Sequence, residues 1–479
     1  MSQYKTPDVY VREKSILPPS VAEVATAIPA FIGYSTKIED INGESIVQKP
    51  IRIKSMIEFE ANFGGAYQES FMLKSKNDTN TAFKVISLDA GGTEVNGAPA
   101  AQYFLYQAVS HFFANGGGAC YVVTVGEAGS GLSKADFETA VAGLNKVDEV
   151  TLISTPETIG LGAVDHYSVQ NKSLAHAESR MDRFALVDVQ MQMVKTATGD
   201  FDIATDSTML RSSITAGLQY GASYYPYLQT TVARSYNESN VNVYIDDGTG
   251  TDTFNIVSMA DLGDDAAADY SAQTYNLVKA ELGKNYLVLP PSPAVAGAIA
   301  KTDKDRGVWK APANVALSQV LAPKVAIDND DQKNLNVDAT SGKSINAIRS
   351  FVGKGTLVWG ARTLAGNDNE WRYVSVRRLF NTVEESIQKA THFAVFEPNT
   401  PFTWLKLKTM IESYLENLWR AGAFFGETPE QAFFVNVGLG QTMTEDDINN
   451  GIMNIEIGLA AVRPAEFIVL TFSHKSIEG

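Results

Sequence analysis

Three short segments of the sequence contain residue types that bind nucleotides in other proteins. Gly342-Lys343-Ser344 resembles the end of a phosphate-binding loop, in which backbone amides and the lysine hold the phosphates. Val337 stands where that loop requires its first glycine, so the backbone cannot fold around a phosphate in this way. Gly438-Leu439-Gly440 lacks the third glycine of a dinucleotide loop, and Gly116 to Gly118 precede an expected strand instead of following one. The sequence therefore predicts no nucleotide site.

Other titratable residues also fall short of a catalytic or metal-binding pattern. Asp328, Asp330 and Asp331 resemble the start of a calcium loop, but no glycine follows at the turn position and no glutamate closes the loop, so we expect a solvated acidic loop. No paired-carboxylate or Ser/His/Asp arrangement can be defended from spacing. None of the histidines lies in an H-E-x-x-H or C-x-x-C context, and each is interpreted as a surface or core residue: His111, His166, His176, His392 and His474.

A cluster of arginines, Arg372, Arg377 and Arg378, could bind carboxylates through guanidinium forks. Arg377 and Arg378 are adjacent in an expected helix, so they point to different sides of it. At most part of the cluster can therefore contact one partner.

Composition and charge are those of a globular protein with an acidic surface. The chain has 479 residues, of which 44% are hydrophobic and 20% charged. That length suffices for about two to four packed cores. The formal net charge of -16 should repel nucleic acid and anionic lipid headgroups, so a nucleic-acid-binding role is disfavoured.

The single cysteine and the N-terminal segment indicate where the protein is made. Cys120 lies in an apolar run and is interpreted as a small core residue, not a nucleophile. The first residues lack the basic start and apolar core of a secretory signal. The apolar run from Val21 to Tyr34 carries Glu23 and Pro29 and is shorter than the roughly 20 residues that span a bilayer. We expect synthesis and folding in the cytoplasm, without membrane insertion.

Strands alternate with helices over the first half of the chain. A helix is expected from Pro99 to Asn115, and Ser133 with Asp136 begins another. Strands spaced by about 30 residues and separated by helices predict right-handed crossovers and a largely parallel sheet. The fold class is therefore α/β, in a mixed α+β chain. The expected strands are Ala25–Ser35, Cys120–Val125, Val150–Ser154, Phe184–Val189 and Ala222–Leu228.

The polar stretch from about Val232 to Gly283 is expected to be a small β insertion on the surface. The second half then contains a strand around Leu357 to Trp359, a turn at Ala365 to Asn369, and a helix with apolar residues from Val376 onward. Further elements are a helix from Trp404 to Leu418 closed by Gly422, helix starts at Thr428-Pro429 and Thr444, and strands at Phe433–Val437 and Ile452–Ile457.

Two terminal segments have strand character but no obvious partner. Near the N-terminus, Val9 and Val11 face one way and Tyr10 the other, before Pro18-Pro19 breaks the pattern. Near the C-terminus, Ala465–His474 is apolar on both faces and should not lie at an exposed edge. From the residues alone, each segment belongs either to this chain's own sheet or to that of another subunit. The C-terminal residues concerned are Phe467, Ile468, Val469, Leu470, Thr471 and Phe472.

Several sequence blocks occur together and in a characteristic order. They are TPDVYVREKS near the start, FFANGGGACYVVTVG, MDRFALVD, YGASYYPYL, PPSPAVAGAIAKTDKDRGVWKAPAN, INAIRSFVGKGTLVWGARTL, WRYVSVRRL, VFEPN and RPAEFIVLTF. In this order and spacing the blocks resemble contractile tail sheath proteins of phage tails, pyocin-like particles and extracellular contractile injection systems. The resemblance is strongest from Asn285 onward and weak over residues 39–96 and 232–283.

The resemblance implies a structural subunit and no cofactor, metal or enzymatic activity. Subunits of this family form a six-start helical sleeve that contracts around an inner tube and drives it through a target envelope. The implied partners are further copies of the chain, the inner tube protein, baseplate and terminal cap proteins, and paralogous sheath subunits. We expect assembly in the bacterial cytoplasm, followed by a place in a phage tail or a released particle.

The resemblance also implies how the chain is divided. The expected parts are an N-terminal arm at 1–24, an outer α/β region at 25–344 with the insertion at 232–283, an inner α/β domain at 345–464, and a C-terminal arm strand at 465–479. Each arm would add a strand to a neighbouring subunit, through Val9, Tyr10 and Val11 at one end and Phe467 to Phe472 at the other. Glu427 and Glu430 are expected to face the tube.

Two other functions remain as alternatives. A non-contractile shell, adhesin or baseplate component could use the same fold. An α/β enzyme would need a substrate crevice at the strand ends around Val125, Ser154 and Val189, which the failed catalytic motifs disfavour.

Overall fold

The chain forms two compact units in a computed structural model that describes residues 21–77, 79–88, 93–96, 100–192, 201–247, 249 and 253–469. Among these residues, the first unit holds 21–24 and 382–462, and the second holds 25–381 and 463–469. The fold class is mixed α/β, as predicted.

A nine-stranded sheet is the centre of the second unit. Its six consecutive inner strands from β16 to β6 are mutually parallel, whereas β2, β17 and β14 pair antiparallel at the two ends. The strand order is β14 (Val315–Ala316), β17 (Gly355–Val358), β16 (Ile345–Phe351), β9 (Gly221–Tyr225), β8 (Phe184–Asp188), β7 (Leu152–Ser154), β1 (Pro29–Ser35), β6 (Cys120–Glu127) and β2 (Ile51–Ile53). The expected division after Ser344 falls inside this sheet, because β16 pairs with β9; the compact unit continues to Asn381.

Helices cover both faces of this sheet, as the alternation of strands and helices predicted. One face packs against α1 (Met56–Phe63), α2 (Leu105–Ala114), α8 (Ser292–Arg306) and the start of α10 (Val374–Thr391). The other face packs against α3 (Lys134–Gly143), α4 (Ala163–Arg180), α5 (Ile203–Ser213) and α9 (Asn329–Asn336). Short 3-10 turns are Leu144–Lys146, Pro156–Gly160 and Leu218–Tyr220. The arrangement is a three-layer α/β unit.

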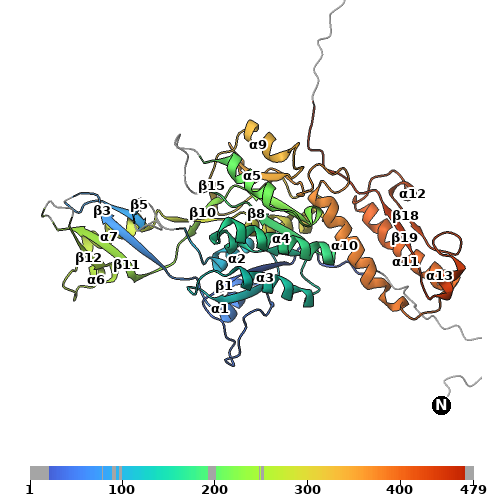
Figure 1. Ribbon diagram of the computed structural model, residues 1–479, viewed down its shortest axis with the longest axis horizontal. Coiled ribbons are helices and arrows are strands. Elements are labelled where there is room, and N and C mark those ends of the chain that lie inside the picture. Colours follow the sequence, from blue (N-terminus) through green and yellow to red (C-terminus); the bar gives the residue numbers. More distant parts are fainter. Residues whose placement is uncertain are drawn as a thin grey trace, which may run out of the picture. The chain divides into compact units, whose positions relative to one another are not determined.

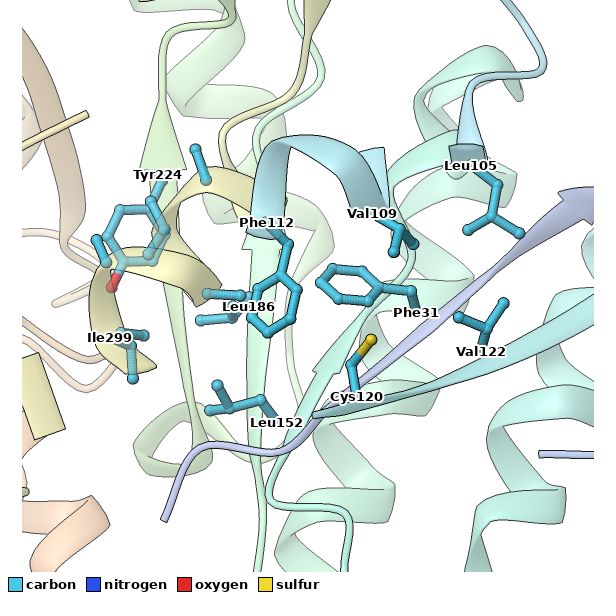
Figure 2. Close-up of a cluster of buried hydrophobic side chains, with 14 of the residues drawn as sticks. Phe31, Leu105, Val109, Phe112, Cys120, Val122, Leu152, Leu186, Tyr224 and Ile299 are labelled. Atoms are coloured by element: carbon cyan, nitrogen blue, oxygen red, sulfur yellow. The ribbon is translucent and has the colours of Figure 1, made fainter. Parts of the chain in front are cut away.

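Aromatic and aliphatic side chains fill the space between the sheet and α2 (Figure 2). The rings of Phe31 on β1 and Phe112 on α2 have centroids 5.1 Å apart. Cys120 lies beside them and is fully buried, as predicted for a core residue. Pro99 lies outside the described residues, but residues 100–104 are not helical, so α2 begins later than expected, at Leu105.

Two smaller sheets complete the second unit. One has the order β13 (Tyr286–Leu289), β10 (Leu228–Ala233) and β15 (Val320–Pro323). The other has the order β12 (Phe254–Ser258), β11 (Tyr236–Asp246), β3 (Glu69–Ser75), β4 (Phe83–Leu88) and β5 (Glu94–Asn96), and packs on α6 (Met259–Gly263) and α7 (Ala272–Leu282). Figure 1 shows the blue β3 beside the yellow-green β11, with which it pairs in parallel. The expected insertion is therefore one half of a separate sheet whose other half comes from residues 69–96.

The first unit contains the second half of α10, the turn His392–Ala394, α11 (Pro401–Arg420), α12 (Pro429–Ala432), β18 (Phe433–Asn436), α13 (Glu445–Asn449) and β19 (Glu456–Leu459). The helix starts at Pro429 and after Thr444 are confirmed; Thr444 and Asp447 form a capping box. Trp404, Val437 and Met443 form a small core. Among the helices in the described part of the chain, none is long and apolar enough to cross a membrane.

The segment Gly355–Phe380 folds as a strand, a turn and a helix, as expected, and buried hydrogen bonds hold its first part against β16. The buried amide of Asn346 donates to the carbonyls of Ser223 and Arg362, at 3.0 and 2.7 Å, and accepts from the Arg362 amide at 2.8 Å. A Cβ at Gly360 would lie 2.7 Å from the Asn346 Oδ1 atom. The small residue therefore lets the segment approach β16 closely.

Candidate assembly site

The two-stranded sheet of the first unit has unpaired strand edges. β18 and β19 pair antiparallel from Phe433 opposite Leu459 to Asn436 opposite Glu456. Within residues 382–462 this sheet has no third strand, although Phe424 makes an isolated bridge to Ala461. A two-stranded sheet is marginally stable alone, and an unpaired edge presents free N–H and C=O groups to another strand. The geometry allows a further strand to pair here.

Large apolar side chains of the first unit also face solvent. Phe425 and Phe434 are 75% and 48% exposed, and the Phe434 ring lies over Gly458, where a Cβ would be 2.1 Å from the ring. Phe396 is fully exposed and has a φ of 68°, a conformation that few side-chain-bearing residues adopt. Phe402, in the first turn of α11, is 79% exposed. Together with the unpaired edges, these side chains make the surface of this unit suited to protein contacts.

The C-terminal segment leaves its apolar side chains uncovered by its own chain. Phe467, Ile468 and Val469 are all more than 70% exposed, and residues 463–469 contain no strand. The expected contact residues Leu470, Thr471 and Phe472 lie outside the described residues, as do Val9, Tyr10 and Val11 of the N-terminal segment. The assignment of either segment as a donated strand stays a prediction.

The base of the C-terminal segment is held by one carboxylate in the second unit. Glu466 accepts hydrogen bonds from Arg362 Nε and Nη2, at 2.9 and 2.7 Å to its two oxygens. Asn336 Nδ2 donates to Oε1 at 2.7 Å and the Tyr373 hydroxyl donates to Oε2 at 3.1 Å. Burial raises the pKa of Glu466, but these donors outweigh it and the pKa is lowered overall. We call these four residues the Glu466 clamp.

The two glutamates expected to face the tube are solvent-exposed. Glu427 precedes α12 and its amide bonds the Gln431 side chain; Glu430 lies in the first turn of α12. Exposure is compatible with a partner contact, and the assignment stays a prediction.

The place where an α/β enzyme would bind its substrate is filled by one of the chain's own carboxyl groups. The strand order reverses at β1 and β7, with β6 on one side of β1 and β8 beyond β7, and ligands of such sheets bind at the carboxyl ends of the strands there. Glu157 follows β7 and is fully buried at this point. Its Oε1 accepts from the amides of Phe104 and Leu105 at the start of α2, at 2.6 and 2.7 Å, and its Oε2 accepts from the Tyr34 amide at 2.6 Å. A ligand anion would have to displace it.

A second buried carboxyl group occupies the start of α8 in the same way. Asp188, at the end of β8, accepts from the Ser292 amide at 2.9 Å and from the Ser292 hydroxyl at 2.5 Å. The Ser154 hydroxyl lies 2.9 Å from that of Ser292, and His166 Nε2 lies 2.9 Å from the Asp188 carbonyl oxygen. Asp188 and Glu157 therefore satisfy helix N-termini that bind phosphate in nucleotide-binding folds.

The residues that imitated binding motifs also have structural roles. Lys343 Nζ donates to the Arg211 carbonyl, and Ser344 Oγ donates to the Asn336 carbonyl. Asp328 does not lie in the expected acidic loop: it caps α9 through a capping box with Asp331. The expectation of a loop overlooked that an aspartate three residues before another is also a helix-start signal.

The arginine cluster is divided among different partners, as predicted from helix geometry. The Arg377 guanidinium stacks 4.0 Å from the Trp371 ring centroid, and its Nε donates to Asn381 at 2.7 Å. Arg378 pairs with Asp303. Arg372, which is half-buried, donates to Asn369 at 2.9 Å.

Comparison with known proteins identifies the family of this chain. Residues 366–475 match the family model of the phage tail sheath C-terminal domain. The tail sheath protein of Vibrio phage KVP40 is 29% identical over 138 residues, which span 29% of this chain but only 20% of the phage protein. A chain in the structure of the anti-feeding prophage (AFP) baseplate is 30% identical, with 99% of this chain and 100% of that chain covered and a TM-score of 0.63. This chain belongs to the contractile tail sheath family.

A second solved structure extends the likeness of this sheath protein to an assembled sheath. A chain of the PVC sheath complex, from an extracellular contractile injection system in the contracted state, is 30% identical over 99% of both chains, with a TM-score of 0.64. These two relatives therefore come from a baseplate structure and from a sheath structure.

The residues of this sheath protein that sequence patterns missed are those bound by distant partners. Glu157 had no local signal, because the helix start that it caps lies 52 residues away. Glu466 did have a signal, since it is the one acidic residue in the apolar run AEFIVLTF. Arg362, its partner 104 residues away, lies in the WGARTL block that carried the resemblance.

Proposed function

We propose that the chain polymerises as a six-start helical sleeve around an inner tube and shortens to drive that tube through a target envelope. The observation that carries this proposal is the likeness over 99% of the chain to a subunit of a contracted sheath. Further copies of the chain and a baseplate are its first partners; an inner tube protein, a terminal cap protein and paralogous sheath subunits are the others. Assembly takes place in the bacterial cytoplasm, before the sleeve becomes part of a phage tail or a released particle.

The terminal segments link neighbouring subunits in this proposal. Phe467 to Phe472 of one copy, and Val9 to Val11 of another, pair with the β18–β19 sheet of a third. A donated strand of about six residues makes roughly four to six backbone hydrogen bonds, each contributing about 1 kcal/mol net. Burial of each large apolar side chain adds roughly 1.5 to 3 kcal/mol. Exposure of Phe467, Ile468 and Val469 in the single chain supports this role.

The proposed function includes no catalytic turnover. Glu157 and Asp188 satisfy the helix starts at the strand ends where a substrate crevice would lie. Work is done instead by conversion of an extended lattice into a more stable contracted one.

Negative-stain electron microscopy of the purified protein and of particles from its source tests this proposal. We expect hollow tubes with a helical surface lattice, and a longer, narrower form in intact particles. Deletion of residues 1–16 should abolish ordered tubes while leaving the monomer folded. Monomers or dimers under all conditions would refute the sheath role, and ordered tubes from the deletion variant would refute the arm assignment.

A non-contractile baseplate component is the second candidate, because one full-length relative comes from a baseplate structure. A polymer that keeps one length and diameter in intact and discharged particles would favour it.

A further inference from the structure

The Glu466 clamp is the last attachment of the C-terminal segment to its own chain within residues 463–469. The four donor atoms of the clamp come from three residues of the second unit. These are Asn336 at the end of α9, Arg362 in the WGARTL block and Tyr373 directly before α10. The residues on either side, Ala465 and Phe467, are exposed. Among residues 463–469, the hydrogen bonds of Glu466 therefore hold the segment to the rest of the second unit.

The clamp is built as a specific carboxylate receptor. The Arg362 side chain is 5% exposed, and its fork binds both oxygens of Glu466, the geometry in which arginine discriminates best for a carboxylate. Arg362 Nη1 also donates to the Gly366 carbonyl at 3.3 Å, which holds the guanidinium in place. If Glu466 is released, the buried Arg362 guanidinium loses its counter-charge, so release costs free energy and rebinding of Glu466 is favoured.

We propose that the Glu466 clamp sets the free length of the C-terminal arm that reaches a second copy of the chain. With the clamp closed, the free arm begins at Phe467. With the clamp open, it begins at Arg463, directly after the hydrogen bond from the Val462 amide to the Ala423 carbonyl. The four added residues lengthen the reach by at most about 14 Å. This inference rests on the proposed arm role, and it makes the linkage between copies adjustable during contraction.

The residues directly after the clamp lie along a groove that does not enclose them, so the arm can take different directions while Glu466 stays bound. The groove has a volume of about 570 Å³, and its walls include Lys310, Gln332, Trp359, Phe467 and Ile468. Phe467 and Ile468 line the groove without being buried in it, at 72% and 79% exposure. The arm can therefore change direction directly after Glu466 while the clamp is closed. When the clamp is open, residues 463–466 add to the free length of the arm.

Limited proteolysis of the unassembled full chain tests whether Arg362 holds Glu466. A glutamate-specific protease cleaves after Glu466 only when that residue is released. We expect Arg362→Gln to increase cleavage of the Glu466–Phe467 bond at least tenfold, while the control Glu178→Gln, an exposed helical glutamate of the second unit, leaves the rate unchanged. Equal cleavage in wild type and Arg362→Gln would overturn the clamp.

Assembly of full-length variants tests whether the clamp matters for the arm. We expect Glu466→Gln to reduce tube formation at least fivefold, and the double variant Arg362→Gln/Glu466→Gln to lose no more than either single variant, because both act through one contact. Glu466→Gln replaces a partly exposed side chain, so it keeps the test valid if Arg362→Gln does not fold. Wild-type tube formation by Glu466→Gln would overturn the proposal.

A variant lacking residues 467–479 separates this proposal from the arm role. If that variant assembles normally, the arm role fails and the clamp has no arm to adjust. If it does not assemble while Glu466→Gln does, the arm role stands and only the clamp proposal is refuted.

Discussion

Arg378 of α10 and Asp303 of α8 form an ion pair that is almost completely withdrawn from solvent. Arg378 Nη1 donates to Asp303 Oδ1 at 2.9 Å, and the two side chains are 3% and 5% exposed. Arg378 Nη2 also donates to the Thr26 carbonyl at 2.7 Å, so one guanidinium joins α10, α8 and the segment before β1.

Substitution of Arg378 by alanine should be strongly destabilising. It leaves the Asp303 carboxylate buried without its counter-charge, and loss of one partner of a buried pair costs about 3 to 5 kcal/mol. The measurement is the free energy of unfolding in urea. Arg306→Ala, which removes an exposed arginine of the same helix α8, should change it by less than about 1 kcal/mol. Equal effects of the two substitutions would contradict a structural role for the buried pair.

The stability of the subunit should fall as pH rises from 6.5 to 8. Burial raises the pKa of Glu157 to about 8 and that of Asp188 to about 7, each against opposing hydrogen bonds, so the folded state retains protons that the unfolded state releases. Burial lowers the pKa of His166 and His176 from 6.5 to about 4, which has the opposite effect below pH 6.5. Above pH 6.5 the unfolded state loses its remaining histidine protons within about one pH unit, so the carboxyls dominate and the unfolding free energy should decrease by roughly 2 kcal/mol.

Urea unfolding at several pH values between 6 and 8.5 measures this slope. Glu157→Gln should remove most of it, because the amide does not titrate. A wild-type stability that is flat or rises across this range would show that Glu157 is ionised in the folded state.

The thiol of Cys120 should be unreactive in the folded protein. It is fully buried, and burial raises its pKa well above the ordinary range, whereas the thiolate is the reactive form. A thiol reagent at pH 8 should label it at least a hundredfold faster in denaturant than in buffer. Rapid labelling without denaturant would mean that the core between β6 and α2 opens readily.

Gly366→Ala should destabilise the turn before α10. A Cβ at this position would lie 1.8 Å from Ser344 Oγ and 3.1 Å from the Ser344 backbone nitrogen, and Ser344 is fully buried. Overpacking of this kind costs about 1 to 3 kcal/mol. Gly65→Ala is the matched control, because a Cβ there meets nothing within 4 Å. Thermal unfolding of both variants measures the difference.

Local periodicity was sufficient to predict the elements whose signals lie within one segment. The apolar spacing from Val376 and from Trp404 predicted α10 and α11, and Thr428 and Thr444 marked the two short helices. These features depend on helix geometry and capping, which neighbouring residues determine.

Pairings between distant segments were not accessible in this way. β3 and β11 pair in parallel, with Phe71 opposite Val241. The residues near either strand contain no signal that identifies the other strand as its partner. The start of α2 was placed too early because its cap is the side chain of Glu157. Prediction of the Glu466 clamp would have required both the glutamate and its hydrogen-bond donors. The isolated glutamate is visible in the sequence, but its three donor residues lie 93 to 130 positions away and carry no signal that connects them to it.

The place of β16 beside β9 has a consequence for the growing chain on the ribosome. Asn346 and Ser223, which bond across these strands, are 123 residues apart. At a synthesis rate of about 5 to 20 residues per second, the edge of β9 that pairs with β16 stays unpaired for roughly 6 to 25 seconds. A nascent chain is therefore most prone to aggregate during this interval, and any translation product that stops before Ile345 keeps that edge open permanently.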